Sequence, residues 1–432
     1  MRSLRRSAAE VPRGTALVVG LVSGSHAVNH MYLVLLPPVL PTLAREFEVS
    51  LAALGVAMGA QAFVNTVCQL PYGYLADERD RTLTLGLCLT LGSIGALILA
   101  LAPTFEWLLV GQVVVGLGVA GHHPAHFPLL ADATAERNRA RAFSVHGFAG
   151  NLGFAAPPVL ITAIAAHPAL TWRHAFGLIG GVGLLYAAVA VVTLLRGVDP
   201  EIRRSNADAD VDAPPGREPR SVGDRLRAGI RSIASAPGIL GLGLFALVAS
   251  TVMWGVTSFV VVLLTEGYGL DSGTANLALS SAFVVGAGLI LIGGDLADRV
   301  GPGPVLVGSY LLVAAFVFAL ASFAVPPLVA AVCAVCAGSV GSLSLPARDK
   351  LADALSARGD VGKNFAVITV GIMIGNAVAP PVFGALIESS GLSPAFAAIA
   401  AVALLAVALV GTIVRRVDGA GVGAKGAGTG GD

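Results

Sequence analysis

The chain has 432 residues, of which 55% are hydrophobic and only 12% are charged, and its formal net charge is +1. Soluble globular domains carry about 25% charged residues, so this composition excludes a water-soluble protein of this length and indicates lipid as the solvent for most of its surface. The near-neutral charge gives no indication of a nucleic-acid partner.

Twelve apolar runs follow one another along the chain, each long enough to cross a hydrocarbon core of about 30 Å as an α-helix. In the first half we predict membrane helices over 15–40, 51–75, 83–102, 106–131, 142–166 and 174–195. In the second half we predict them over 238–265, 275–297, 304–325, 327–347, 364–387 and 392–414. Runs of this length exclude an outer-membrane barrel, whose strands need only about 10 residues. The predicted fold is an all-α integral membrane protein.

The polar segments divide the chain into two bundles of six helices. A basic stub over 1–14 precedes the first bundle, 15–195. A linker rich in proline and charge, 196–237, separates it from the second bundle, 238–414. The glycine-rich tail, 415–432, is expected to be disordered.

Basic residues are concentrated in alternate connections between the predicted helices. With the N-terminus placed in the cytoplasm, only Arg45 and Arg173 of the 27 lysines and arginines fall on the outer side. Cytoplasmic loops of membrane proteins are enriched in such residues. We therefore predict a multi-pass protein of the cell membrane, in contact with lipid, monomeric, and with both termini in the cytoplasm.

The two halves carry matching motifs at nearly the same offset along the chain. The loop after the second span reads GYLADERDR, and the loop after the eighth reads GDLADRVG. The fifth and eleventh spans each carry a Gly-Asn pair followed by Ala-Pro-Pro-Val. Duplicated halves are typical of secondary transporters, whose substrate site lies between the repeats.

On these motifs the chain resembles the major facilitator superfamily over nearly its whole length. The resemblance implies two pseudo-symmetric six-helix bundles and a conformational switch in the loop motif. It also implies that Asp77 pairs with the start of the eleventh span, near Lys363 and Asn364, when the cytoplasmic side is shut. The implied switch residues are Gly73, Asp77, Arg81, Gly294, Asp298 and Arg299.

Within the superfamily the chain most resembles the fosmidomycin-resistance-like efflux branch. Gln112 stands where that branch carries an arginine in the fourth span. The similarity is carried by Ser25, His26, Asn29, Gly116, Gly118, His123, Pro124, Gly147, Gly150 and Asn151.

Six of the eight histidines fall in the predicted spans of the first half: His26, His30, His122, His123, His126 and His146. The pairs His26/His30 and His122/His126 have a spacing of four, which places each pair on one helical face. Proton carriage, metal coordination and structural hydrogen bonding all remain open for these residues. No carboxylate or thiol completes a metal site, so we predict no metal. The candidates for proton coupling are His26, His30, His123 and His146.

No aspartate or glutamate falls in the middle of a predicted span. Carriers of lipophilic cations commonly need a buried carboxylate, so we predict a neutral or anionic substrate. The residues expected to line its cavity are Asn29, Gln112, His126, Asn151, Trp254 and Asn376.

The predicted function is secondary active transport of a small organic solute by alternating access, in the direction of export. The expected driving force is an ion gradient, H⁺, with no cofactor. The sequence holds no nucleophile–base constellation and no phosphate-binding loop, so we predict that the chain is not an enzyme. Import of a small organic anion or nutrient is the alternative, and a receptor that binds without turnover also remains open.

Overall fold

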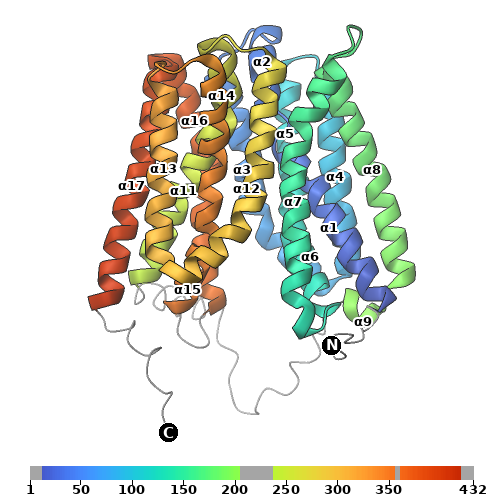
Figure 1. The fold of residues 1–432 in the computed structure, drawn as a ribbon. Coiled ribbons are helices and arrows are strands. Elements are labelled where there is room, and N and C mark those ends of the chain that lie inside the picture. The colour runs from blue at the N-terminus through green and yellow to red at the C-terminus, as the bar shows by residue number, and fades with distance from the viewer. Residues whose placement is uncertain (1–11, 205–236, 356–360, 420–432) are drawn as a thin grey trace, which may run out of the picture.

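The computed structural model describes residues 12–204, 237–355 and 361–419, nearly all of them helical. Within this part of the chain, twelve helical segments are long and apolar enough to cross a membrane. The predicted all-α membrane fold with twelve spans is therefore confirmed. The described helices make two bundles that stand side by side (Figure 1).

The first bundle contains α1 (Arg13–Leu33), η1 (Pro37–Val39), α2 (Leu40–Glu46), α3 (Leu51–Glu78), α4 (Arg81–Leu101), α5 (Phe105–Ala120), α6 (His122–Asp132), α7 (Glu136–Ala165), α8 (Trp172–Gly197) and α9 (Pro200–Arg203). The second contains α11 (Pro237–Val262), the π-helix η3 (Leu263–Gly267), α12 (Ser272–Val300), α13 (Pro302–Ala321), α14 (Pro327–Val340), η4 (Gly341–Leu343), α15 (Ser344–Ala354), α16 (Val361–Ser390) and α17 (Leu392–Gly419).

Two spans of the first bundle are broken, each one turn before a proline. Helix α1 ends at Leu33, four residues before Pro37, and α5 ends at Ala120, four residues before Pro124. A proline ring clashes with the carbonyl four residues earlier, which explains both positions. After the second break, α6 starts at His122.

The connection between the bundles starts with ordered structure. Helix α8 extends to Gly197, and the short α9 follows it. Arg203 of α9 is buried and forms an ion pair with Asp80, which caps α4. These residues fix the start of the connection onto the first bundle. The remainder of the predicted linker, 205–236, lies outside the described residues, as do 1–11 and 420–432.

The two ends of the molecule differ in charge. We call the end at which α1 begins and α17 ends, the lower end in Figure 1, the basic end, and the opposite one the far end. At the far end, the described basic residues are Arg45 and Arg173. At the basic end, those whose side chains the structure describes are Arg13, Arg79, Arg81, Arg137, Arg139, Arg141, Arg196, Arg203, Arg204, Arg299, Arg348, Lys350 and Arg415.

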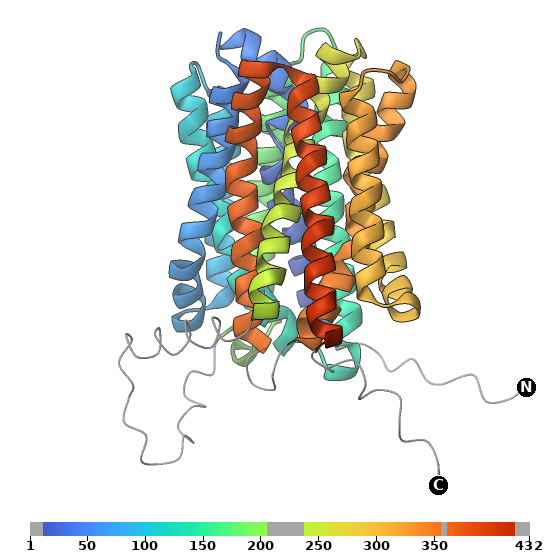
Figure 2. The same ribbon diagram turned by 90° about the vertical axis from the view of Figure 1, so that its left-hand side faces the viewer.

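The bundles meet at the far end and separate toward the basic end. Helices α7 and α12 converge at the top of Figure 1, and α3 and α16 run side by side in Figure 2. A Cβ on Gly59 would lie 2.9 Å from the carbonyl oxygen of Ala377, and one on Gly384 would lie 2.7 Å from that of Leu51. On the same α3, Gly73 near the basic end has no atom within 4 Å of such a Cβ. Glycines of α3 and α16 thus let the backbones of the two bundles approach closely at the far end.

Candidate functional site

The six histidines of the first bundle gather in one place, and we call them the histidine cluster: His26, His30, His122, His123, His126 and His146. They come from three helices, α1, α6 and α7. The rings of His26 and His146 stack in parallel with centroids 4.0 Å apart, and those of His122 and His126 are 4.4 Å apart. The predicted sharing of a face within each pair is confirmed, since the rings of His26 and His30 also lie 4.0 Å apart.

Local backbone features bring these side chains together. After the break at Gly121, α6 carries His122 and His123, whose rings lie 5.5 and 5.7 Å from that of His26 on α1, and His126, whose ring lies 4.2 Å from that of His146 on α7. On α7, a Cβ on Gly150 would lie 2.6 Å from Nδ1 of His26. Gly150 is therefore the residue that leaves room for the His26 ring between α1 and α7.

Hydrogen bonds fix the orientation of four of the six rings. Nδ1 of His26 donates to the carbonyl of His146 at 2.9 Å, and Nδ1 of His30 donates to the carbonyl of Gly150 at 2.9 Å. Nε2 of His146 and Nε2 of His126 lie 2.8 Å apart, so one of these two nitrogens donates and the other accepts. The cluster is a connected network from α1 through α7 to α6.

Several ring nitrogens of the cluster are buried without a hydrogen-bond partner in the described protein. They are Nε2 of His26, both nitrogens of His122, and Nδ1 of His123, His126 and His146. Buried polar groups in native proteins nearly always have a partner, and exceptions often mark functional sites. The arrangement provides imidazole lone pairs and N–H groups that can hold a proton, an ion or a solute.

An aromatic contact joins the cluster to the second bundle. Phe154 of α7 stacks on His30 at 4.0 Å and on Phe283 of α12 at 5.2 Å, and Trp254 of α11 lies 6.3 Å away. Beside this contact on the same two helices, Ser280 of α12 donates to the carbonyl of Ala155, the residue after Phe154. Sequence reasoning named Trp254 but missed Phe154 and Phe283, because single phenylalanines in an apolar span carry no signal of their own.

The predicted cavity residues are only partly brought together. His126 belongs to the cluster, Trp254 is buried beside Phe154, and Asn151 donates to the carbonyl of Gly147 on its own helix. Asn29 and Gln112 are buried, and their side-chain oxygens have no partner among the described residues. Asn376 is half-buried on α16, in the second bundle.

The final aspartate of the switch motif is paired in the second bundle but not in the first. Asp298 forms an ion pair of 2.7 Å with Lys350, and Arg299 pairs with Asp295 one turn before it. Gly294 precedes them on α12. Asp77 is exposed and has no ion pair or hydrogen bond within the described part of the chain. The expected pairing of Asp77 concerns the shut state, and the side chain of Lys363 lies outside the described residues.

Arg81, the third motif residue of the first bundle, takes a different partner. It donates to Asp132 at 2.5 Å and is itself buried. This bond ties the start of α4 to the end of α6, the helix that carries three cluster histidines.

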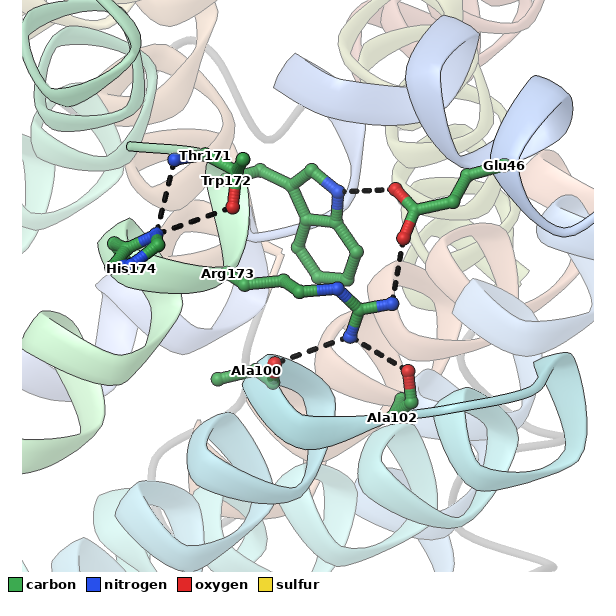
Figure 3. Close-up of polar contacts among 7 residues, drawn as sticks. All are labelled: Glu46, Ala100, Ala102, Thr171, Trp172, Arg173 and His174. Carbon is green, nitrogen blue, oxygen red and sulfur yellow. Dashed lines mark hydrogen bonds and ion pairs between the residues drawn. The ribbon is translucent and has the colours of Figure 1, made fainter. Parts of the chain in front are cut away.

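A cleft of about 630 Å³ lies at the far end between the two bundles. Sequence reasoning did not predict it. Beside it, Glu46 of α2 accepts hydrogen bonds from Trp172 at 2.7 Å and from Arg173 at 2.6 Å (Figure 3). Bonds from the Thr274 side chain and amide lower the pKa of Asp271, which caps α12 at the cleft. The polar side chains that line the cleft include Thr42, Glu46, Thr162, Arg173, Asp271 and Asn276.

Arg173 also donates to the carbonyls of Ala100 and Ala102, at 3.2 and 2.7 Å. Its guanidinium lies over the ring of Trp172 at 4.4 Å. The arginine thereby holds α2, the end of α4 and the start of α8 together, so this far-end basic residue serves packing within the first bundle.

The fold and this site define an α-helical membrane protein of the secondary-transporter class. The chain belongs to the Major Facilitator Superfamily, whose model matches residues 22–288 and 242–429. This membership confirms the predicted resemblance and places the chain among carriers of small-molecule solutes, which are not enzymes.

Two relatives and one solved structure illustrate the similarity. The chain is 29% identical to the uncharacterized MFS-type transporter YfnC of Bacillus subtilis, over 94% of this chain and 95% of the relative. It is 26% identical to the fosmidomycin resistance protein of Escherichia coli, over 70% of each. The crystal structure of a bacterial homologue of the human lysosomal transporter Spinster, in an inward-facing and occupied conformation, superposes with a TM-score of 0.74 at 18% identity, covering 93% of this chain and 97% of that one.

Proposed function

We propose that the chain exports a small neutral or anionic organic solute across the cytoplasmic membrane, in exchange for H⁺, by alternating access. The observation that carries this proposal is the position of the histidine cluster. It lies beside the contact of Phe154 with Phe283 and Trp254, where the two bundles meet, and the bundles separate from there toward the basic end. Secondary transporters of this class bind their solute between repeats that rock about the site.

The substrate class is supported by the charges that are buried. Within the described residues, the only buried acidic side chain is that of Asp80, which pairs with Arg203 at the start of α4. A cationic solute in the centre of the membrane would need a counter-charge. A neutral or anionic solute needs none, and imidazole N–H groups can donate hydrogen bonds to its oxygens.

The proposed coupling ion is H⁺, with His26, His30, His123 and His146 as its carriers. These four side chains lie in one connected cluster next to the junction of the bundles. Histidine exchanges protons near neutral pH, and the network of imidazoles and carbonyls offers a proton several neighbouring positions.

The proposed orientation places the basic end in the cytoplasm, with both termini on that side. Arginine and lysine are enriched in cytoplasmic loops, and 13 of the 15 basic residues named above for the two ends lie at the basic end. The bundle helices form the surface that faces lipid, and one chain holds both repeats, so we propose that a monomer is the working unit.

Fosmidomycin is the first probe for this function, because a relative confers resistance to it. Expression in an Escherichia coli strain that lacks its own fosmidomycin resistance protein should raise the inhibitory concentration several-fold. In inverted membrane vesicles, acidification of the lumen should drive labelled fosmidomycin inward, and nigericin should abolish this uptake. Accumulation that ignores nigericin would contradict proton coupling.

Import of a small organic anion or nutrient is the alternative direction, since the fold serves both. The same vesicles distinguish the two. Solute that enters right-side-out vesicles with an acidic exterior, and not inverted ones with an acidic lumen, would assign import. A screen of a deletion strain in its native host against many toxins and nutrients then identifies the solute.

A further inference from the structure

Three histidines of the cluster are placed to chelate one ion. His26 and His30 lie on successive turns of α1, and His123 comes from α6. Each can offer one ring nitrogen such that the three nitrogens lie within 4.8 Å of one another. Sequence reasoning predicted no metal because no carboxylate or thiol completed a site with the histidine pairs. The fold brings a third histidine from a second helix instead.

The hydrogen bonds of His26 and His30 determine which nitrogen each ring can offer. Nδ1 of His26 is 2.9 Å from the carbonyl of His146, and Nδ1 of His30 is 2.9 Å from the carbonyl of Gly150. A carbonyl only accepts, so both Nδ1 atoms carry hydrogen and, in the neutral rings, both Nε2 atoms carry a lone pair. Nε2 of His26 is buried and has no partner in the described protein.

This is the arrangement that metal-binding histidines adopt. Such residues donate their second N–H to a backbone carbonyl or a carboxylate, which fixes the tautomer and aims the other nitrogen at the ion. The carbonyls of His146 and Gly150 both belong to α7, so one helix orients two donors at once.

We propose that His26, His30 and His123, three of the four residues proposed above to carry H⁺, bind a transition-metal dication of the zinc, cobalt or nickel type, for which protons compete at the same nitrogens. Three neutral imidazoles suit these borderline ions, whereas Mg²⁺ and Ca²⁺ require oxygen donors that the three residues do not supply. A three-histidine site leaves one position of a tetrahedral ion open for water or an anionic solute. The side chains of His30 and His123 are partly exposed, whereas Nε2 of His26 and Nδ1 of His123 are buried.

The surroundings of the site support a defined geometry. The His26 ring is seated against Gly150, where a side chain would collide with it. The His30 ring is stacked on Phe154, which in turn stacks on Phe283 of the second bundle. An ion bound here lies next to the contact between the bundles.

Metal binding is measured directly on the purified full-length protein in detergent, with no transport assay. Titration with Co²⁺ should produce the visible absorption bands of a tetrahedral ion, saturating at one ion per chain, and calorimetry with Zn²⁺ should give the same stoichiometry. His30→Gln and His123→Gln should each weaken binding at least about tenfold. Circular dichroism and thermal unfolding check that each variant remains folded.

Two controls separate this site from other histidines. The double variant His167→Ala/His174→Ala removes the two exposed histidines near the far end and should bind as the wild type does. His122→Gln removes a cluster histidine outside the proposed ligand set and should also retain binding. Absence of saturable Co²⁺ and Zn²⁺ binding to folded wild type, or equal loss in either control, overturns the proposal. Because the readout is binding, failure of the transport proposal leaves this test intact.

Discussion

Nε2 of His126 and Nε2 of His146 lie 2.8 Å apart, across the interface between α6 and α7. One ring donates and the other accepts, so the pair holds one shared hydrogen and each residue depends on the other. Removing either ring leaves its partner buried with an additional nitrogen that has no hydrogen bond.

This dependence predicts a measurable coupling between the two positions. His126→Leu and His146→Leu should each lower the free energy of unfolding by about 1–3 kcal/mol, the usual cost of a buried group left unpaired. The double variant should lose about 0.5–3 kcal/mol less than the sum of the single losses. Thermal unfolding in detergent measures all four proteins, and strict additivity would show that the two rings are energetically independent.

The position of Gly150 predicts that the cluster can be disrupted without changing a histidine. A Cβ on Gly150 would lie 2.6 Å from Nδ1 of His26, whereas one on Gly147 of the same helix has no atom within 4 Å. Gly150→Ala should displace the His26 ring, break its bond to the His146 carbonyl and strongly reduce transport. Gly147→Ala adds a methyl group where there is open space, so this variant should transport as the wild type does. Solute flux in proteoliposomes compares them, and equal activity would contradict the packing argument.

Much of the fold could be predicted from the sequence because membrane helices are coded by length and apolarity. Each span needs about 20 apolar residues, so the number of helices follows from counting, and the arginines of alternate loops predict the orientation of the helices. Even the breaks have a local cause, since Pro37 and Pro124 each end a helix four residues earlier. The internal repeat added the division into two bundles.

The site was only partly predictable because it depends on contacts between helices distant in sequence. The spacing of His26 and His30 shows a shared face, but nothing local shows that α7 crosses α1 at Gly150 and brings His146 to His26. The same limit explains why Gln112 and Asn376 were named as cavity candidates although they lie outside the cluster. The polar character of a side chain does not show which helix it packs against. The role of Phe154 requires the second bundle to be in place.

The buried ion pair between Asp80 and Arg203 predicts an unequal response of two neighbouring arginines. Arg203 is 7% exposed and also donates to the carbonyl of Val198, whereas Arg204 is exposed. Removing one partner of a buried pair leaves an uncompensated charge, so Arg203→Ala should cost about 3–5 kcal/mol. Arg204→Ala should cost less than about 0.5 kcal/mol. Thermal unfolding in detergent tests this, and similar midpoints for both variants would contradict it.

The cap formed by Asp271 predicts a pH-dependent contribution to stability. Hydrogen bonds from Thr274 lower its pKa in the folded state. The stabilisation is therefore fully present above the unfolded pKa of about 3.9 and is lost as the pH falls through the lower folded value. Asp271→Ala should cost about 1 kcal/mol at pH 7, and this difference should shrink below about pH 4. Asp271→Asn keeps one cap oxygen but loses the charge and the second oxygen that Thr274 bonds, so thermal unfolding in detergent should show it less stable than wild type at pH 7 and without this loss in acid.

Glycines of α3 predict which substitution shifts the balance between the two sides of the carrier. A side chain at Gly59 would collide with Ala377 and Pro381 of the second bundle, so Gly59→Val should open the far end. Gly73 has open space around it, so Gly73→Ala should leave the far end closed. A cysteine introduced at Asn276, which lines the far-end cleft and is buried while the far end is closed, reports on opening. In a background with the four native cysteines replaced, a membrane-impermeant maleimide applied to intact cells should label this cysteine faster with Gly59→Val than with Gly73→Ala. Gly59 is packed against α16 and Gly73 is not. Equal labelling rates for the two variants would therefore show that the α3–α16 contact does not control access.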